Sequence, residues 1–95
     1  MIEVRISTDG IKMSGHAGYA PEGQDIVCSA VSVLTQNLVE SIRGLTKDEI
    51  KCEISHGSAD IEYGNLSEKA LTLVDSFFIG IAMIADEYPD HVRIV

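Results

Sequence analysis

Apolar and polar residues alternate at the start of the chain, and this pattern predicts a β-hairpin. The alternation from Ile2 to Ser7 has the period of two that is typical of a strand with one buried face. Asp9-Gly10 is a strong turn signal, so a second strand is expected from about Ile11 to His16. Residues 17–24 then contain two glycines and a proline, and we expect this loop to be mobile.

Two helices are predicted where apolar residues recur every three or four positions. The first extends from Ile26 to Arg43, with Asp25 as its N-cap and Gly44 as the residue that ends it. The second begins after Ser67, a favoured N-cap residue, and Pro89 stops it. Apolar residues cover much of the circumference of the second helix, which predicts that it is buried on two sides.

The remaining segments again alternate and complete an α+β arrangement. Ile50 to Ser55 and Ser58 to Tyr63 flank His56-Gly57, which predicts a second hairpin, and His91 to Val95 reads as a last strand. The predicted order is ββαββαβ, with a small, mostly antiparallel sheet packed with two helices. A length of 95 residues suits a single domain over residues 1–95.

Charge and hydropathy limit the partners and the compartment. The net charge of −8 opposes the phosphate neutralisation on which nucleic-acid binding depends, so no direct nucleic-acid partner is expected. The longest apolar stretch, Phe77 to Ala85, is too short to span a bilayer, and Met1 to Arg5 does not resemble a secretory signal. We therefore expect a cytoplasmic protein with two reduced cysteines and no membrane contact. No lysine or arginine occurs between Met13 and Ile42, so this region would attract a basic partner.

His16 and Cys28 flank the glycine-containing loop and are the candidate catalytic pair. With Asp25 as N-cap, Cys28 is the third residue of the helix, where the positive end of the helix dipole favours a thiolate. A histidine at the end of a strand could reach this thiol and act as its base. Two alternatives stay open from the residues alone: Cys28 could be a small buried residue on the packing face, and His16 could be satisfied by the backbone.

Asp25 and Ser32 are candidate supporting residues. Asp25 could cap the helix, orient His16 or do both, and capping is the main interpretation. Ser32 lies one turn after Cys28, where its hydroxyl could bond the sulfur, a substrate group or the backbone carbonyl four residues earlier. Backbone N–H groups of the first helical turn are the expected oxyanion donors.

Other chemistries receive weaker support. The loop glycines could cradle a phosphate, but the missing basic residues argue against it. Cys52 is expected in the core, and His56 and His91 are expected on the surface. The spacing of these residues supports no zinc site, so neither metal nor cofactor is expected. Cys52 is the only candidate partner for a redox-sensing role of Cys28.

The motif resembles the signature of a known family. It consists of Gly15-His16-Ala17, then Gly23, then Asp25-Ile26-Val27-Cys28-Ser29-Ala30-Val31-Ser32. This run is similar to that of the ribosomal-processing cysteine proteases, the Prp family, and the resemblance extends over the whole chain in length and element order.

The resemblance implies a role for each motif residue. His16 and Cys28 map onto the catalytic dyad of the family, and Asp25 and Ser32 map onto its supporting aspartate and serine. Gly15, Ala17, Gly18 and Gly23 belong to a flexible substrate loop that is expected to become ordered over a bound peptide.

The resemblance also implies an activity. It is that of an endopeptidase, usually a homodimer, that removes the N-terminal extension of the large-ribosomal-subunit protein numbered twenty-seven and so supports ribosome assembly. A basic ribosomal substrate fits the acidic composition. The competing hypothesis is a non-catalytic binding module for a basic ribosomal or assembly protein.

Overall fold

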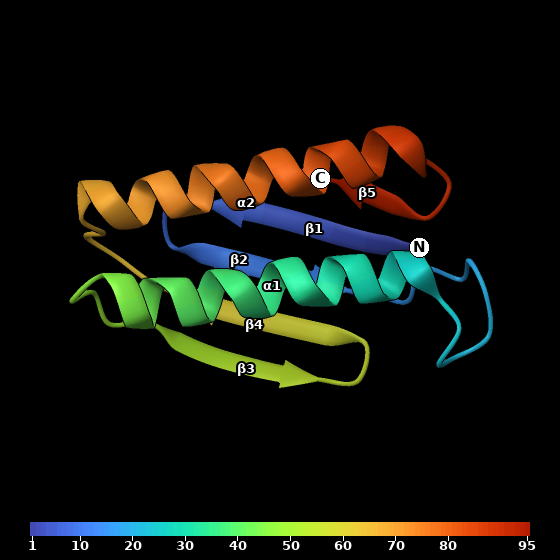
Figure 1. Cartoon of the computed structure of the whole chain (residues 1–95), viewed down its shortest axis with the longest axis horizontal. Coiled ribbons are helices and arrows are strands. Elements are labelled where there is room, and N and C mark those ends of the chain that lie inside the picture. Colours follow the sequence, from blue (N-terminus) through green and yellow to red (C-terminus); the bar gives the residue numbers. More distant parts are fainter.

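The computed structural model describes residues 1–95 and contains five strands and two helices (Figure 1). The elements are β1 (Ile2–Ser7), β2 (Gly10–Ser14), α1 (Ile26–Leu45), β3 (Lys51–Ser55), β4 (Ser58–Glu62), α2 (Glu68–Glu87) and β5 (Val92–Ile94). The predicted ββαββαβ order and the α+β class are confirmed. Neither helix is long and apolar enough to cross a membrane.

The five strands form one sheet in the order β3-β4-β2-β1-β5. The pairs β1–β2, β2–β4 and β3–β4 are antiparallel, and only β1–β5 is parallel, so the predicted mostly antiparallel sheet is confirmed. Both helices lie side by side on the same face of the sheet (Figure 1). The loop before α1 and the β3–β4 turn therefore lie at the same end of the molecule.

The core lies between the sheet and the two helices. Alternate strand residues such as Val4, Ile11 and Ile61 point into it and are at most 1% exposed. Ile42 of α1 and Ile81 of α2 meet them from the other layer and are fully buried. Each such side chain contributes about 1.5–3 kcal/mol by leaving water, so the period-two and helical patterns together determine which faces pack.

Strand β2 ends at Ser14, two residues earlier than predicted. Gly15 has a positive φ of 99°, and a Cβ there would overlap the carbonyl oxygen of Met1. Its N–H donates to the carbonyl of Gly57, 2.9 Å away. The chain therefore leaves the sheet at Gly15, and His16 lies in the loop and not on the strand.

Gly44 does not end α1, which is a second correction. The helix continues through Leu45, and Thr46 caps it. The backbone N–H and the hydroxyl of Thr46 both donate to the carbonyl of Ile42, at 3.1 and 2.6 Å. Because Thr46 satisfies this terminal carbonyl, the helix needs no left-handed glycine to stop.

The second helix is buried on one side only, so the prediction of burial on two sides is wrong. Its buried residues are Ala70, Val74, Phe77 and Ile81. The outer side carries exposed large apolar residues, namely Leu71, Phe78, Ile79 and Met83. The sheet and α1 occupy one side of α2, and no third layer of this chain covers the other.

Strands β2 and β4 approach closely at Gly10, and this contact generates a stability prediction. A Cβ at Gly10 would overlap the backbone carbonyl oxygen of Ile61, which cannot move without disturbing the sheet. We expect Gly10→Ala to lower the free energy of unfolding by about 1–3 kcal/mol, measured by urea denaturation. Gly64→Ala is the matched control, since a Cβ there meets open space. Equal stability of the two variants would contradict the close approach.

Candidate active site

Asp25 joins the start of α1 to the preceding loop. One carboxylate oxygen accepts from the N–H groups of Val27 and Cys28, at 3.0 and 2.9 Å. The other accepts from the N–H groups of Tyr19 and Ala20, at 3.0 and 3.2 Å. Burial of this carboxylate opposes its ionisation, but the four backbone N–H donors outweigh burial and hold the pKa of Asp25 below its ordinary value of 3.8. Asp25 thus caps the helix, as predicted, and makes no hydrogen bond to His16.

The first half of the loop is anchored against the C-terminal segment. Ala17 is buried, and its carbonyl accepts a hydrogen bond from His91 Nδ1 at 2.8 Å. Since a carbonyl can only accept, this bond places a proton on Nδ1 of His91. The Tyr19 ring packs edge-on against Tyr88 and His91, with centroids 5.3 and 5.4 Å away. His91, expected on the surface, is therefore half-buried and holds the loop.

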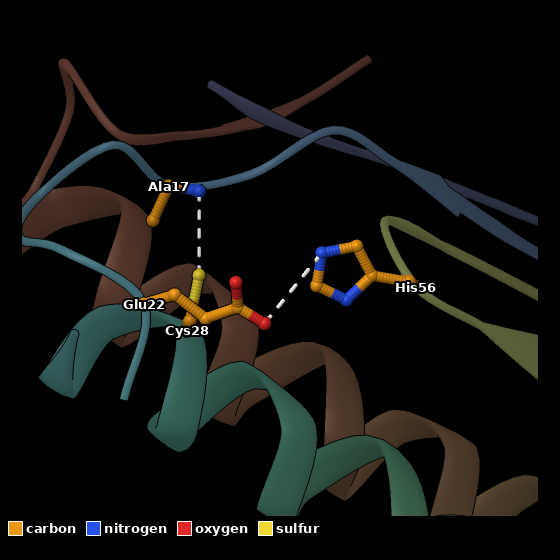
Figure 2. Close-up of polar contacts among 4 residues, drawn as sticks. All are labelled: Ala17, Glu22, Cys28 and His56. Atoms are coloured by element: carbon orange, nitrogen blue, oxygen red, sulfur yellow. Dashed lines mark hydrogen bonds and ion pairs between the residues drawn. The ribbon is translucent and has the colours of Figure 1, made fainter. Parts of the chain in front are cut away.

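Cys28 is half-buried in the first turn of α1, with its sulfur facing the loop (Figure 2). The backbone N–H of Ala17 donates to Cys28 Sγ at 3.4 Å. The peptide group of Ala17 and the helix start therefore fix the sulfur from two sides. The sulfur thus lies beside one backbone N–H donor and close to the positive end of the dipole of α1.

His16 lies in the loop and contacts the β3–β4 turn. Gly57 in this turn has a φ of 79°, and a Cβ there would lie only 2.8 Å from His16 Nε2. The His16 and His56 rings are neighbours, with centroids 4.8 Å apart and planes tilted by 47°. No hydrogen bond joins His16 to Cys28, although both side chains line the same cavity.

This cavity of about 660 Å³ lies between the loop, the first half of α1 and the β3–β4 turn. Its size is within the range of ligand pockets, about 300–1,000 Å³. Met13, Ile54 and Ala59 contribute apolar surface, and no lysine or arginine lines it. The cavity can therefore hold a segment of a peptide next to the sulfur.

The remaining candidates are placed as follows. Ser32 lines the cavity one turn after Cys28, but its hydroxyl bonds neither the sulfur nor the carbonyl of Cys28. Gly15, Gly18 and Gly23 line the same cavity, and all three have positive φ angles.

Both cysteines are free, and Cys52 is half-buried against the core. The structure shows no group of three side chains suited to a metal ion.

The predicted oxyanion donors need correction. The N–H groups of Val27 and Cys28 already donate to Asp25, and the N–H of Ser29 donates to the Asp25 carbonyl at 3.1 Å. The donor aimed at the sulfur is instead that of Ala17, in the loop. Sequence reasoning missed this group because a backbone N–H has no residue signature.

His56 was also missed as a cavity residue. The sequence predicts His56 on the surface, and its side chain is exposed, but the turn that carries it forms one wall of the cavity. Its Nε2 lies 3.7 Å from Glu22 Oε1 of the loop (Figure 2). Only the pairing of β2 with β4 brings this turn beside the loop, and no local sequence signal shows it.

The fold and the site together suit a thiol-dependent hydrolase. A thiol at a helix start, a histidine on the same cavity and an N–H donor at the sulfur are the parts that covalent catalysis by cysteine needs. Comparison with known proteins identifies the class more closely. The sequence profile of the cysteine protease Prp family matches residues 1–93, so the chain belongs to this family of ribosomal-processing cysteine proteases.

Individual relatives agree with the family match. The ribosomal processing cysteine protease Prp of Staphylococcus aureus is 24% identical over 98% of this chain and 94% of its own length. The Bacillus subtilis protein of the same name is 24% identical over 87% of this chain and 80% of its own. A crystal structure of the S. aureus protease with a covalently linked product peptide superposes with a TM-score of 0.89, at 22% identity over 98% and 94% of the two chains. A crystal structure from Streptococcus mutans superposes with a TM-score of 0.81, at 29% identity over 99% of this chain and 91% of the other.

The Asp25 contacts generate a pH-dependent prediction. Asn at position 25 keeps one oxygen acceptor but leaves two of the four N–H donors unpaired, so Asp25→Asn should cost about 1 kcal/mol of stability at pH 7. The folded-state pKa of Asp25 lies below 3.8, so the contribution of its carboxylate is complete about one pH unit above 3.8 and is lost as the pH falls through the folded value.

Denaturation of both proteins between pH 7 and pH 2.5 tests this prediction. The difference between wild type and Asp25→Asn should be constant down to about pH 5 and then shrink. A difference that grows on acidification would contradict the account. Because Glu3 and Asp48, whose pKa values are also lowered, are present in both proteins, the comparison isolates Asp25.

Proposed function

We propose that Cys28 is the nucleophile and His16 the general base of peptide-bond hydrolysis in this chain. The observation that carries the proposal is that both side chains line one cavity while the Ala17 N–H donates to the sulfur. Family membership supports a cysteine protease rather than a non-catalytic binding module. Residues 1–95 would then form a single cysteine protease domain.

The reaction proceeds in two halves. His16 takes the proton of the Cys28 thiol, and the thiolate attacks the scissile carbonyl carbon to form a tetrahedral oxyanion. His16 then gives the proton to the leaving amine as the C–N bond breaks, which leaves a thioester on Cys28. Water, deprotonated by His16, hydrolyses the thioester and regenerates the thiol. The Ala17 N–H, which faces the sulfur, is the proposed oxyanion donor.

His16 must approach the sulfur before proton transfer. In the free protein its ring lies against Gly57 and His56 and has no bond to Cys28. Catalytic hydrogen bonds are often long in free enzymes and tighten when substrate binds. Residues Pro21 to Gln24 are exposed, and their one polar contact to another element is the 3.7 Å contact of Glu22 with His56, so this half of the loop can close over a peptide.

The proposed substrate is the N-terminal extension of the large-ribosomal-subunit protein numbered twenty-seven. Relatives are named as ribosomal processing proteases, which supports this class of substrate. The net charge of −8 and a cavity without lysine or arginine suit a basic ribosomal protein. Processing during ribosome assembly would take place in the cytoplasm.

We also propose a homodimer that covers the outer side of α2. Leu71, Phe78, Ile79 and Met83 expose apolar surface there, and contiguous patches of this kind often mark protein interfaces. Their placement on a 20-residue helix with one uncovered side suits a second copy packed against the same helix.

Catalysis is tested with the extended ribosomal protein as substrate and mass spectrometry of the new N-terminus. Cys28→Ala should abolish cleavage because no thiol remains, and His16→Ala should lower the rate constant by at least about 10². Cys52→Ala is the matched control and should retain activity, since this cysteine does not line the cavity. Cleavage by Cys28→Ala, or a rate for His16→Ala within twofold of wild type, would contradict the assignment.

The dimer is tested by light scattering after gel filtration. The double variant Ile79→Glu, Met83→Glu should be monomeric, because charge on both partners would be buried in the interface. Leu45→Glu places the same charge at an exposed apolar position at the end of α1 and should stay dimeric. A monomeric wild type, or loss of the dimer in the control alone, would remove this proposal.

A further inference from the structure

Glu22 is the available negative charge at the cavity. The cavity is lined by two carboxylates, Glu22 and Asp25, and by no lysine or arginine. Both oxygens of Asp25 already accept two backbone N–H groups each. Glu22 has one polar contact, to the imidazole of His56, and its side chain is 84% exposed. A cation that enters the cavity can therefore pair with the Glu22 carboxylate.

The Glu22–His56 contact is weak and exchangeable. The distance of 3.7 Å between Oε1 and Nε2 is longer than the 2.7–3.2 Å of a hydrogen bond. The His56 side chain is 73% exposed, and exposed ion pairs change an equilibrium constant by about fivefold at most. A stronger cation can therefore replace this imidazole at little cost.

The contact also places Glu22 where a peptide must pass. Figure 2 shows its carboxylate reaching from the loop toward the His56 ring, and Glu22 lines the same cavity as Cys28. Loop and turn form opposite walls of the cavity that holds the sulfur. A peptide whose scissile bond lies at Cys28 thus has a neighbouring side chain within reach of Glu22.

We propose that Glu22 is a specificity-determining residue, whose carboxylate exchanges the His56 imidazole for the ammonium or guanidinium group of a lysine or arginine near the scissile bond of the bound peptide. Lysine and arginine side chains are charged at neutral pH and can approach the carboxylate more closely than the 3.7 Å of the His56 contact, so the exchange favours the substrate. The inference rests on the proposed peptidase function. It identifies Glu22 as the residue that recognises the charge of the substrate.

Peptide binding to the Cys28→Ser variant tests the proposal without requiring catalysis. Fluorescent peptides from the extended ribosomal protein, acetylated so that no N-terminal amine supplies charge, carry lysine, norleucine or glutamate at each of four positions on either side of the bond. At one of these positions, the peptide with lysine should bind about two- to fivefold more tightly than the peptide with norleucine. The preference should decrease as salt is raised, because the interaction is electrostatic.

Variants of Glu22 then assign this preference. Glu22→Gln should remove the preference for lysine, and Glu22→Lys should replace it with a preference for glutamate. Glu40→Gln, a charge removal on α1 outside the cavity, is the matched control and should keep it. His56→Gln should also keep it, because the carboxylate remains. A preference that survives in Glu22→Gln, disappears in His56→Gln, or occurs at no position would overturn the proposal.

The two proposals fail separately. A wild-type protein that cleaves peptides without any charge preference retains the peptidase function and refutes the role of Glu22. A Cys28→Ser protein that shows the Glu22-dependent preference, although wild type cleaves nothing, supports the role of Glu22 and refutes the peptidase.

Discussion

The carboxylate of Asp25 is the constraint on which the candidate site depends. Its four hydrogen bonds join Tyr19 and Ala20 of the loop to Val27 and Cys28 of α1. N-capping needs only the bonds to Val27 and Cys28, and the bonds to Tyr19 and Ala20 hold the loop against the helix. Together with the His91 bond to the Ala17 carbonyl, they keep the Ala17 N–H at the Cys28 sulfur.

The opposite wall is set by the sheet and not by the loop. Pairing of β2 with β4 brings the Gly57 turn beside Gly15, and the two residues share a backbone hydrogen bond of 2.9 Å. The absence of a Cβ at Gly57 leaves room for the His16 ring, which lies in this space. Cys28, the proposed nucleophile, is therefore held by the helix, while the ring of His16, the proposed base, lies against the hairpin. The proposed catalysis requires this ring to move from the hairpin toward the sulfur.

Local patterns predicted the elements and the cap, because both depend on neighbouring residues. A few neighbouring residues suffice to show the alternation in β1 and β4. The same is true of the helical period of α1 and of the Asp25 cap. The predictions that were wrong concern contacts between segments that are far apart in the sequence. The apolar outer side of α2 looked buried because sequence cannot show that no further layer of the chain covers it. Likewise His91 looked exposed, since only the parallel pairing of β5 with β1 brings it under Ala17.

Amide hydrogen exchange of wild type at neutral pH, resolved by residue, tests the Asp25 connection most directly. Tyr19 and Ala20 lie in a loop, and Asp25 is the only acceptor for their N–H groups. The account predicts that these two amides exchange far more slowly than those of Glu22 and Gly23 in the exposed half of the same loop. Exchange of Tyr19 and Ala20 as fast as that of Glu22 and Gly23 would contradict it.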